Sequence, residues 1–139
     1  MNGRLYKLKY CTYICQYHLV WITKYRGKVM VFKYIKTELK RIIKLICRWK
    51  HWRIIQWHIG DEHIHLYIII PPKYLVSYAV DLLKSKSSTW VKKKNKKIPK
   101  GSFWCVDYYL STIGINEIAI KTYIRDQERI RYKNPELPL

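Results

Sequence analysis

Acidic residues are scarce in this chain of 139 residues. Nine Asp and Glu side chains stand against 28 Lys and Arg, which gives a formal net charge of +19 with the histidines neutral. A charge of that size on so short a chain destabilises the compact state by self-repulsion unless an anionic partner is present. The sequence therefore predicts an anionic partner, and nucleic acid and an anionic membrane surface are the two main candidates.

Long apolar runs are also absent. The longest ones, such as residues 66–70, fall far short of the roughly 20 residues that a membrane-spanning helix needs. The N-terminal residues, MNGRL, lack the apolar stretch followed by small residues that marks a signal peptide. We therefore expect a cytoplasmic protein with no membrane partner, which leaves nucleic acid as the favoured ligand.

Disulfides are not expected in that compartment, so the cysteines should be mostly reduced. The chain has four of them, at Cys11, Cys15, Cys47 and Cys105. Cys11, Cys15 and His18 have a spacing that loosely resembles a metal site. They also stand where a strand begins, and buried thiols are common, so a zinc site is the weaker interpretation.

Internal repeats and long linkers are missing as well. A length of 139 residues is typical of one domain, and a hydrophobic content of 49% is enough for a real core and argues against disorder. We predict a single domain over residues 1–139, with a basic arm over about 1–11. The aromatic residues, 13 Tyr, 6 Trp and 2 Phe, can serve that core and can also stack on unpaired bases beside lysine and arginine.

The pattern of apolar residues predicts alternating strands and helices. Residues 13–23 are rich in β-branched and aromatic types, and residues 31–49 carry apolar side chains at helical spacing. The same criteria give the remaining elements, which are strands over 51–59, 63–70 and 103–110, helices over 74–91 and about 116–130, and a lysine-rich loop over 92–100. The order β-α-β-β-α-β is that of a ferredoxin-like α+β fold, an antiparallel sheet with two helices on one face. The additional C-terminal helix is left for the other face or for a partner subunit.

Two histidines alternate with apolar residues on the strand 63–70. Side chains alternate across a strand, so His63 and His65 share one face, while Ile64 and Leu66 share the other. If the apolar face packs on the helices, the two imidazoles lie side by side on the helix-free face, where they could hold one metal ion. Taken alone, a His-x-His pair is more often a half-exposed pair without a ligand. In the last helix, Tyr123 and Gln127 are four residues apart and share a helical face, which alone is weak support for a site.

Together these segments resemble the single-tyrosine HUH transposases that mobilise short insertion sequences as single-stranded DNA, the TnpA-type enzymes. The resemblance covers roughly residues 12–130. The matching segments are YHLVWITKYR at 17–26, DEHIHL at 61–66, LKSKSS at 83–88, FW at 103–104, YYLSTIG at 108–114 and YIRDQ at 123–127. Two positions depart from the usual pattern: Glu62 precedes His63 where the family usually has Asp, and Ser85 stands where it often has Gly.

The resemblance implies a reaction and a site. It implies that Tyr123, on a catalytic helix of about 116–130, attacks a DNA phosphate to form a 5′-phosphotyrosine intermediate and to free a 3′-OH. It implies a divalent metal, magnesium or manganese, held by His63, His65 and Gln127. It also implies a homodimer acting on single-stranded DNA with subterminal hairpins, because one tyrosine makes one covalent link and excision needs two cuts. Gly114 becomes the candidate hinge before the catalytic helix.

Basic residues in several segments are candidates for contacting the DNA backbone. The densest run is the loop after the second predicted helix, and a solvated loop is its ordinary alternative. The net charge favours phosphate binding. The candidates are Lys24, Arg26, Lys84, Lys86, Lys92, Lys93, Lys94, Lys96 and Lys97.

Two other functions are open from the sequence. A domesticated relative, such as the REP-associated tyrosine transposases, would use the same chemistry on dispersed palindromes. A non-catalytic ferredoxin-like module could instead bind nucleic acid by stacking bases on its aromatic sheet. The second would form no covalent adduct and would tolerate replacement of His63, His65, Tyr123 and Gln127.

Overall fold

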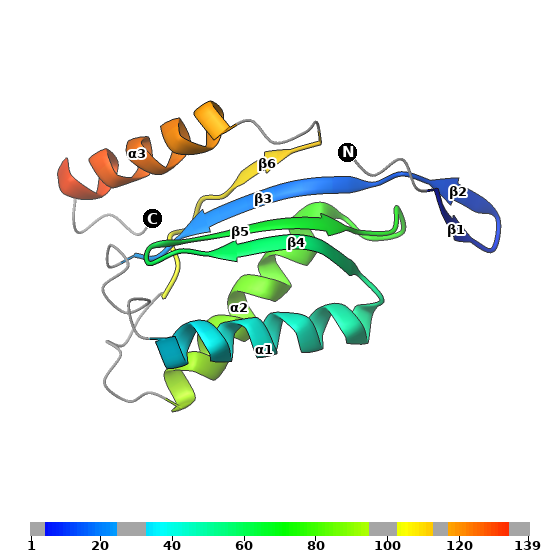
Figure 1. Ribbon diagram of the computed structural model, residues 1–139, viewed down its shortest axis with the longest axis horizontal. Coiled ribbons are helices and arrows are strands. Elements are labelled where there is room, and N and C mark those ends of the chain that lie inside the picture. The colour runs from blue at the N-terminus through cyan, green and yellow to red at the C-terminus, as the bar shows by residue number, and fades with distance from the viewer. Residues whose placement is uncertain (1–4, 25–32, 95–102, 113–116, 134–139) are drawn as a thin grey trace.

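Figure 1 shows the computed structural model, which describes residues 5–24, 33–94, 103–112 and 117–133, with the backbone alone at 117 and 127–133. The strands and helices follow one another as β1 (Tyr6–Leu8), β2 (Cys11–Tyr13), β3 (Gln16–Ile22), α1 (Lys33–Lys50), β4 (Arg53–Ile59), β5 (His63–Ile69), α2 (Val76–Lys94), β6 (Tyr109–Ser111) and α3 (Glu117–Lys133).

The main sheet has four strands in the order β4-β5-β3-β6, and every neighbouring pair is antiparallel. From β3 onward the element order is β-α-β-β-α-β, followed by α3. This is the ferredoxin-like α+β arrangement that the sequence predicted. In Figure 1, α1 and α2 lie on one face of the sheet and α3 lies on the other.

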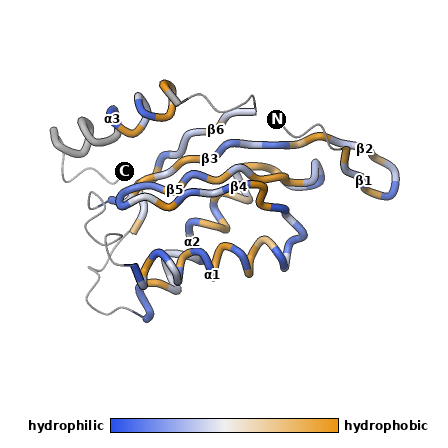
Figure 2. The backbone as a smooth tube through the Cα atoms, in the orientation of Figure 1, coloured by the Kyte–Doolittle hydropathy of each residue, from blue (hydrophilic) through white to orange (hydrophobic). Residues whose placement is uncertain are grey.

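The core lies between the sheet and the pair α1 and α2. The apolar stripe of α1 is buried as its spacing predicted, with Ile35, Leu39 and Ile43 at most 1% exposed. From the sheet, Ile64 and Leu66 of β5 enter the same hydrophobic cluster and are fully buried. Figure 2 shows the hydrophobic residues of α1 recurring between hydrophilic ones, as expected for a helix with one buried face.

Helix α1 ends in a tight turn at His51, the residue at which the sequence placed the start of a strand. His51 has a φ of 61°, and its amide donates to the carbonyl of Arg48. The amide of Trp52 donates to the carbonyl of Cys47 at 2.9 Å. These two bonds form a Schellman cap, so the strand β4 begins only at Arg53.

Three other predicted boundaries were wrong. The strand predicted over 13–23 begins only at Gln16, because Ile14 and Cys15 separate β3 from β2. Strand β2 pairs instead with β1 in a separate two-stranded sheet. Helix α2 continues through Lys92–Lys94, because lysine is a good helix former. The strand predicted over 103–110 is reduced to β6. Within 103–107, Trp104 alone forms a bridge, with Thr23, and the carbonyls of 105–107 bind a side chain described below.

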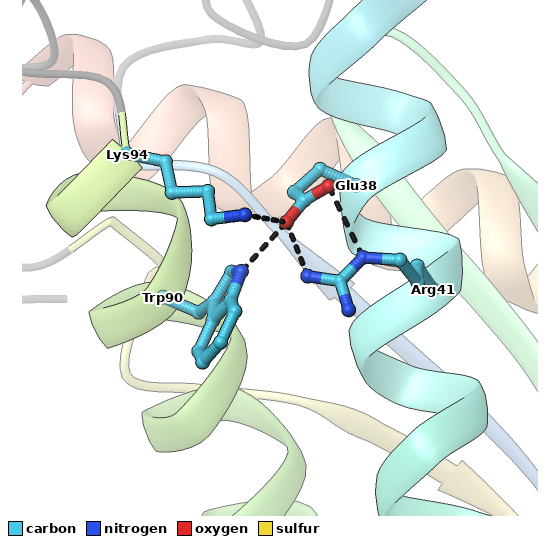
Figure 3. A network of polar contacts seen from close by, with 4 residues as sticks. All are labelled: Glu38, Arg41, Trp90 and Lys94. Carbon is cyan, nitrogen blue, oxygen red and sulfur yellow. Dashed lines mark hydrogen bonds and ion pairs between the residues drawn. The ribbon is translucent and has the colours of Figure 1, made fainter.

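A polar network joins the outer surfaces of α1 and α2 (Figure 3). Glu38 of α1 accepts hydrogen bonds from Arg41 of the same helix and from the indole of Trp90 of α2 at 2.6 Å. The ammonium of Lys94 lies 3.6 Å from the same carboxylate. Both hydrogen bonds lower the pKa of Glu38, with that from Arg41 the larger cause, and the pKa falls to about 2. None of the helices in the described ranges is long and apolar enough to cross a membrane.

Candidate active site

His63 and His65 lie on the sheet face opposite α1 and α2, as the alternation of β5 predicted. Both imidazoles are half-buried, whereas Ile64 between them is fully buried in the core. Burial is the main cause that lowers the pKa of each histidine below its ordinary value of 6.5, and neighbouring histidines lower it further. Both side chains are therefore neutral at pH 7, which is the form of histidine that binds metals.

Two further histidines, His18 on β3 and His58 on β4, lie beside His65 and His63. They were not identified from the sequence as part of this face. Nδ1 of His18 on β3 lies 3.3 Å from Nε2 of His65, so one ring can donate to the other. The His18 ring stacks on Tyr67 with centroids 4.0 Å apart, and the ring of His58 lies 5.8 Å from that of His63. In the sequence, the only signal for His18 was a polar residue inside an apolar strand. Its contact with His65 depends on the register between β3 and β5, which the sequence does not show.

Gly60 makes room for the ring of His63. A Cβ added at Gly60 would lie 2.8 Å from Cε1 of His63, closer than real Cβ atoms approach, and 3.1 Å from its Nδ1. The amide of Gly60 donates to the carbonyl of His63 at 2.9 Å, which closes the turn between β4 and β5. The turn thus fixes the backbone of His63 while its glycine leaves space for the imidazole.

Tyr123 projects from α3 onto the ring of Tyr109 in β6, with centroids 5.8 Å apart. Its hydroxyl is buried and has no hydrogen-bond partner among the residues that the structure describes. Burial raises the pKa of Tyr123 well above its ordinary value of 10, and the charges of Asp107 and Cys105 act in the same direction. In this arrangement the phenol is fully protonated at neutral pH.

One cross-strand row connects the tyrosine to the histidines. Val20 is the register partner of both Tyr109 on β6 and His65 on β5, and His58 on β4 is opposite His65. Directly opposed residues of antiparallel strands point to the same face, so all four side chains lie on the face that α3 covers. Two strand spacings, about 10 Å of sheet, separate Tyr109 from His65.

The residues present fit a small cation at His63 and His65. Nδ1 of His63 is buried and lacks a partner within the described ranges, and the two neutral imidazoles are adjacent on one face. A hollow of about 30 Å³ is lined by His58 and His65 but not by His63, and it has space for a water or an ion but not for a nucleotide. Gln127 lies in α3, and its side chain is outside the described residues. Among the residues described, no three His, Cys, Asp or Glu side chains form a metal-binding group, Cys11, Cys15 and His18 included.

The basic residues predicted to contact DNA have different surroundings. Lys86 and Lys93 are exposed on α2, Lys24 is half-buried after β3, and Lys94 approaches Glu38. Lys84 is half-buried and donates to the carbonyls of Cys105, Val106 and Asp107. Lys92 is half-buried in the last turn of α2. The remaining predicted positions lie outside the described residues, namely Arg26, Lys96, Lys97 and the hinge Gly114.

All four cysteines are free thiols. Cys11 is exposed and Cys15 is partly buried, whereas Cys47 and Cys105 are buried. Burial raises the pKa of Cys47 to about 12, so this thiol is unreactive at neutral pH.

Comparison with known proteins places most of the chain in one group. Residues 11–127 match the family described as "Transposase IS200 like". The transposase for insertion sequence element IS200 of Salmonella typhimurium is 34% identical over 117 residues, which cover 81% of this chain and 76% of that protein. The ISDra2 transposase TnpA of Deinococcus radiodurans is 28% identical over 120 residues, covering 83% and 85%.

Two solved structures share the fold. A crystal structure from Deinococcus radiodurans R1, provisionally described as a transposase, superposes with a TM-score of 0.79 at 26% identity and covers 88% of this chain and 97% of that one. A REP-associated tyrosine transposase bound to a REP hairpin superposes with a TM-score of 0.57 at 14% identity, covering 88% and 74%.

Proposed function

The chain belongs to the family of IS200-like transposases, and on that premise we propose that it cleaves and rejoins single strands of DNA with Tyr123 as the nucleophile. The observation that supports this most is the cross-strand row on the face covered by α3. It places Tyr109, against which Tyr123 packs, and His65 on the same side of the sheet. A tyrosine nucleophile and two imidazoles that could bind a metal, placed on one surface, suit metal-assisted phosphoryl transfer.

The proposed reaction conserves the energy of the DNA backbone. The Tyr123 oxygen forms a bond to the phosphorus as the bond from phosphorus to the 3′-oxygen breaks. The phenol loses its proton, and the 3′-oxygen gains one and leaves as a 3′-OH. The 5′ end stays on Tyr123 as a phosphotyrosine, and attack by another 3′-OH reverses the step and joins a new strand, so no nucleotide cofactor is needed.

His63, His65 and Gln127 would hold a magnesium or manganese ion. When bound, such an ion would polarise the scissile phosphate and offset the charge that develops on it. The neutral imidazoles supply nitrogen ligands without competing protons, and the amide of Gln127 would supply oxygen. The raised pKa of Tyr123 means that this chain does not by itself ionise the phenol before DNA binds.

We propose single-stranded DNA with subterminal hairpins as the substrate and a homodimer as the active unit. The solved REP-associated relative is bound to a hairpin, and a net charge of +19 suits a phosphate backbone. Lys86 and Lys93, which are exposed on α2, are among the described candidates for backbone contacts. Two chains would supply the two tyrosines that cutting both ends of an element requires.

The test is incubation of the protein with labelled single-stranded element ends and Mg²⁺ or Mn²⁺, followed by a denaturing gel. We expect a covalent protein–DNA adduct and a free 3′ end with the wild type. Tyr123→Phe should give neither while binding DNA with unchanged affinity. His63→Ala combined with His65→Ala should lose the metal-dependent cleavage.

Three results would contradict the proposal. Equal cleavage by wild type and Tyr123→Phe would show that Tyr123 is not the nucleophile. Normal metal-dependent cleavage by the double histidine variant would show that His63 and His65 do not hold the metal. Tight DNA binding by the wild type without any adduct, over a range of end sequences, would favour a non-catalytic nucleic-acid-binding module.

A further inference from the structure

Lys84 of α2 points its ammonium group at three consecutive backbone carbonyls. Nζ lies 2.6 Å from the oxygen of Cys105, 3.0 Å from that of Val106 and 3.3 Å from that of Asp107. The number of acceptors equals the number of ammonium protons. Residues 105–107 lie outside β6, so Lys84 binds carbonyls that belong to no strand.

The setting of Lys84 differs from that of a lysine on a DNA-binding surface. The side chain is half-buried, and burial lowers its pKa, although Cys105, Asp107 and Asp81 oppose that shift. Lys86, two residues later on the same helix, is exposed. A phosphate that approached Lys84 would have to displace backbone carbonyls from it, whereas one that approached Lys86 would displace only water.

A second contact anchors the same segment to α2. The buried indole of Trp104 donates to the hydroxyl of Ser87 at 3.1 Å, and Ser87 lies one helical turn after Lys84. On its other side the segment is tied to β3, where the amide of Cys105 donates to the carbonyl of Ile22 at 2.9 Å. Residues 103–107 are therefore fixed between α2 and β3, even though they form no regular strand.

This segment leads directly to the surroundings of Tyr123. Asp107 is close enough for its charge to act on the phenol, and Tyr109, two residues later, is the ring on which Tyr123 packs. Any shift of residues 105–107 would therefore move groups that lie beside Tyr123. Lys84 itself approaches from α2, on the opposite face of the sheet.

We propose that Lys84 is a positioning residue for the reaction of Tyr123 and not a phosphate contact. By holding the carbonyls of residues 105–107, it fixes Asp107 and Tyr109 beside the nucleophile. The inference rests on the proposed function, because it assigns Lys84 to the step in which Tyr123 attacks DNA.

The experiment separates the rate of the covalent step from DNA affinity. Single-turnover adduct formation is measured at saturating labelled single-stranded DNA, and affinity is measured at several salt concentrations in a Tyr123→Phe background. We expect Lys84→Met to lower the rate by about tenfold to a hundredfold, the range that small misplacements of reacting groups cause. Its affinity and the slope of log affinity against log salt should match the parent protein.

Two other lysines calibrate these measurements. Lys86→Met should weaken binding and make the salt slope shallower by about 0.7, the value for one single-strand phosphate contact. Lys44→Met, an equal loss of charge on the exposed side of α1, should leave the rate unchanged. The proposal is overturned if Lys84→Met weakens DNA affinity and flattens the salt slope as Lys86→Met does, and forms the adduct at the wild-type rate when DNA is saturating.

Two variants decide the question even if Lys84→Met fails to fold. Lys84→Arg keeps the charge, but its flat guanidinium cannot match three converging carbonyls as an ammonium does. A wild-type rate in Lys84→Arg would overturn the proposal, and a lowered rate at unchanged affinity supports it. Ser87→Ala removes the acceptor of Trp104 without changing charge, so we expect a lowered rate with an unchanged salt slope.

Failure of the proposed function gives a different result. In that case the wild type itself would form no adduct.

Discussion

At the scale of single residues, Gly60 controls the position of the His63 imidazole in the candidate metal site. It does so because it has no side chain, which leaves space for the ring. The nearest atoms to a Cβ at this position all belong to the imidazole of His63. An imidazole can rotate, so a substitution here is absorbed by the ring and not by the backbone.

We therefore predict that Gly60→Ala displaces the His63 ring and weakens metal binding at least about tenfold, in the range seen when groups that orient ligands are lost. Isothermal titration with Mn²⁺ measures the affinity, and thermal unfolding without metal shows whether the fold is kept. Thr89→Ala, at an exposed and uncharged position of α2 on the opposite face of the sheet, is the control and should bind Mn²⁺ like the wild type. An unchanged affinity in Gly60→Ala would mean that His63 is not a ligand.

His51 carries a different single-residue constraint, because its left-handed backbone terminates α1. Glycine adopts this conformation without strain, so His51→Gly should stabilise the protein by about 0.5–1 kcal/mol. Lys44→Gly on the exposed side of the same helix should destabilise it by about 1 kcal/mol. Urea unfolding monitored by circular dichroism measures both, and equal signs for the two variants would contradict the cap.

At the scale of elements, Glu38 is the polar connection between α1 and α2. Its carboxylate lies among Arg41, Trp90 and Lys94, and its pKa in the folded protein is about 2 against an ordinary 4.5 (Figure 3). A depressed pKa means that the folded state favours the charged carboxylate. The contribution to stability is therefore fully present above pH 4.5 and is lost as the pH falls toward 2.

Glu38→Gln should lower the free energy of unfolding by about 1 kcal/mol at pH 7, the usual net contribution of an intramolecular hydrogen bond. The difference from the wild type should shrink as the pH falls from 4.5 toward 2. Chemical denaturation across this range measures it. Asp61→Asn breaks the exposed ion pair with Lys36 and should change stability by less than about 0.5 kcal/mol. A Glu38→Gln effect that did not depend on pH would contradict the charge-based explanation.

The elements also show where sequence patterns were sufficient. The stripe of α1 and the alternation of β5 were read correctly because each periodicity lies within one segment. The segment 103–110 was predicted as one strand because all its residues except Asp107 are aromatic or apolar. Its carbonyls at 105–107 bind Lys84 instead of a neighbouring strand, and this contact is 21 to 23 residues distant in sequence.

At the scale of the whole molecule, we expect the net charge of +19 to dominate the affinity for DNA. If about six phosphates are neutralised, the slope of log affinity against log salt should be near −4 for single-stranded DNA. Fluorescence anisotropy of a labelled oligonucleotide between low and moderate salt measures the slope in the Tyr123→Phe variant. A neutral peptide–nucleic-acid analogue of the same sequence is the control and should bind weakly with no slope. A flat response with DNA would contradict phosphate-dominated binding.

The sequence by itself determined the fold class, the place of His63 and His65 on one face and the chemical types of the candidate site. These follow from composition and from periodicities of two and 3.6 residues, which are local properties. Only the tertiary structure decided that His18 contacts His65, that Tyr109 supports Tyr123 and that Lys84 holds backbone carbonyls. The reason is physical, because each of these contacts depends on strand register or on the packing of a helix against a distant segment. The local sequence around a polar side chain does not show whether that side chain will contact solvent, phosphate or backbone.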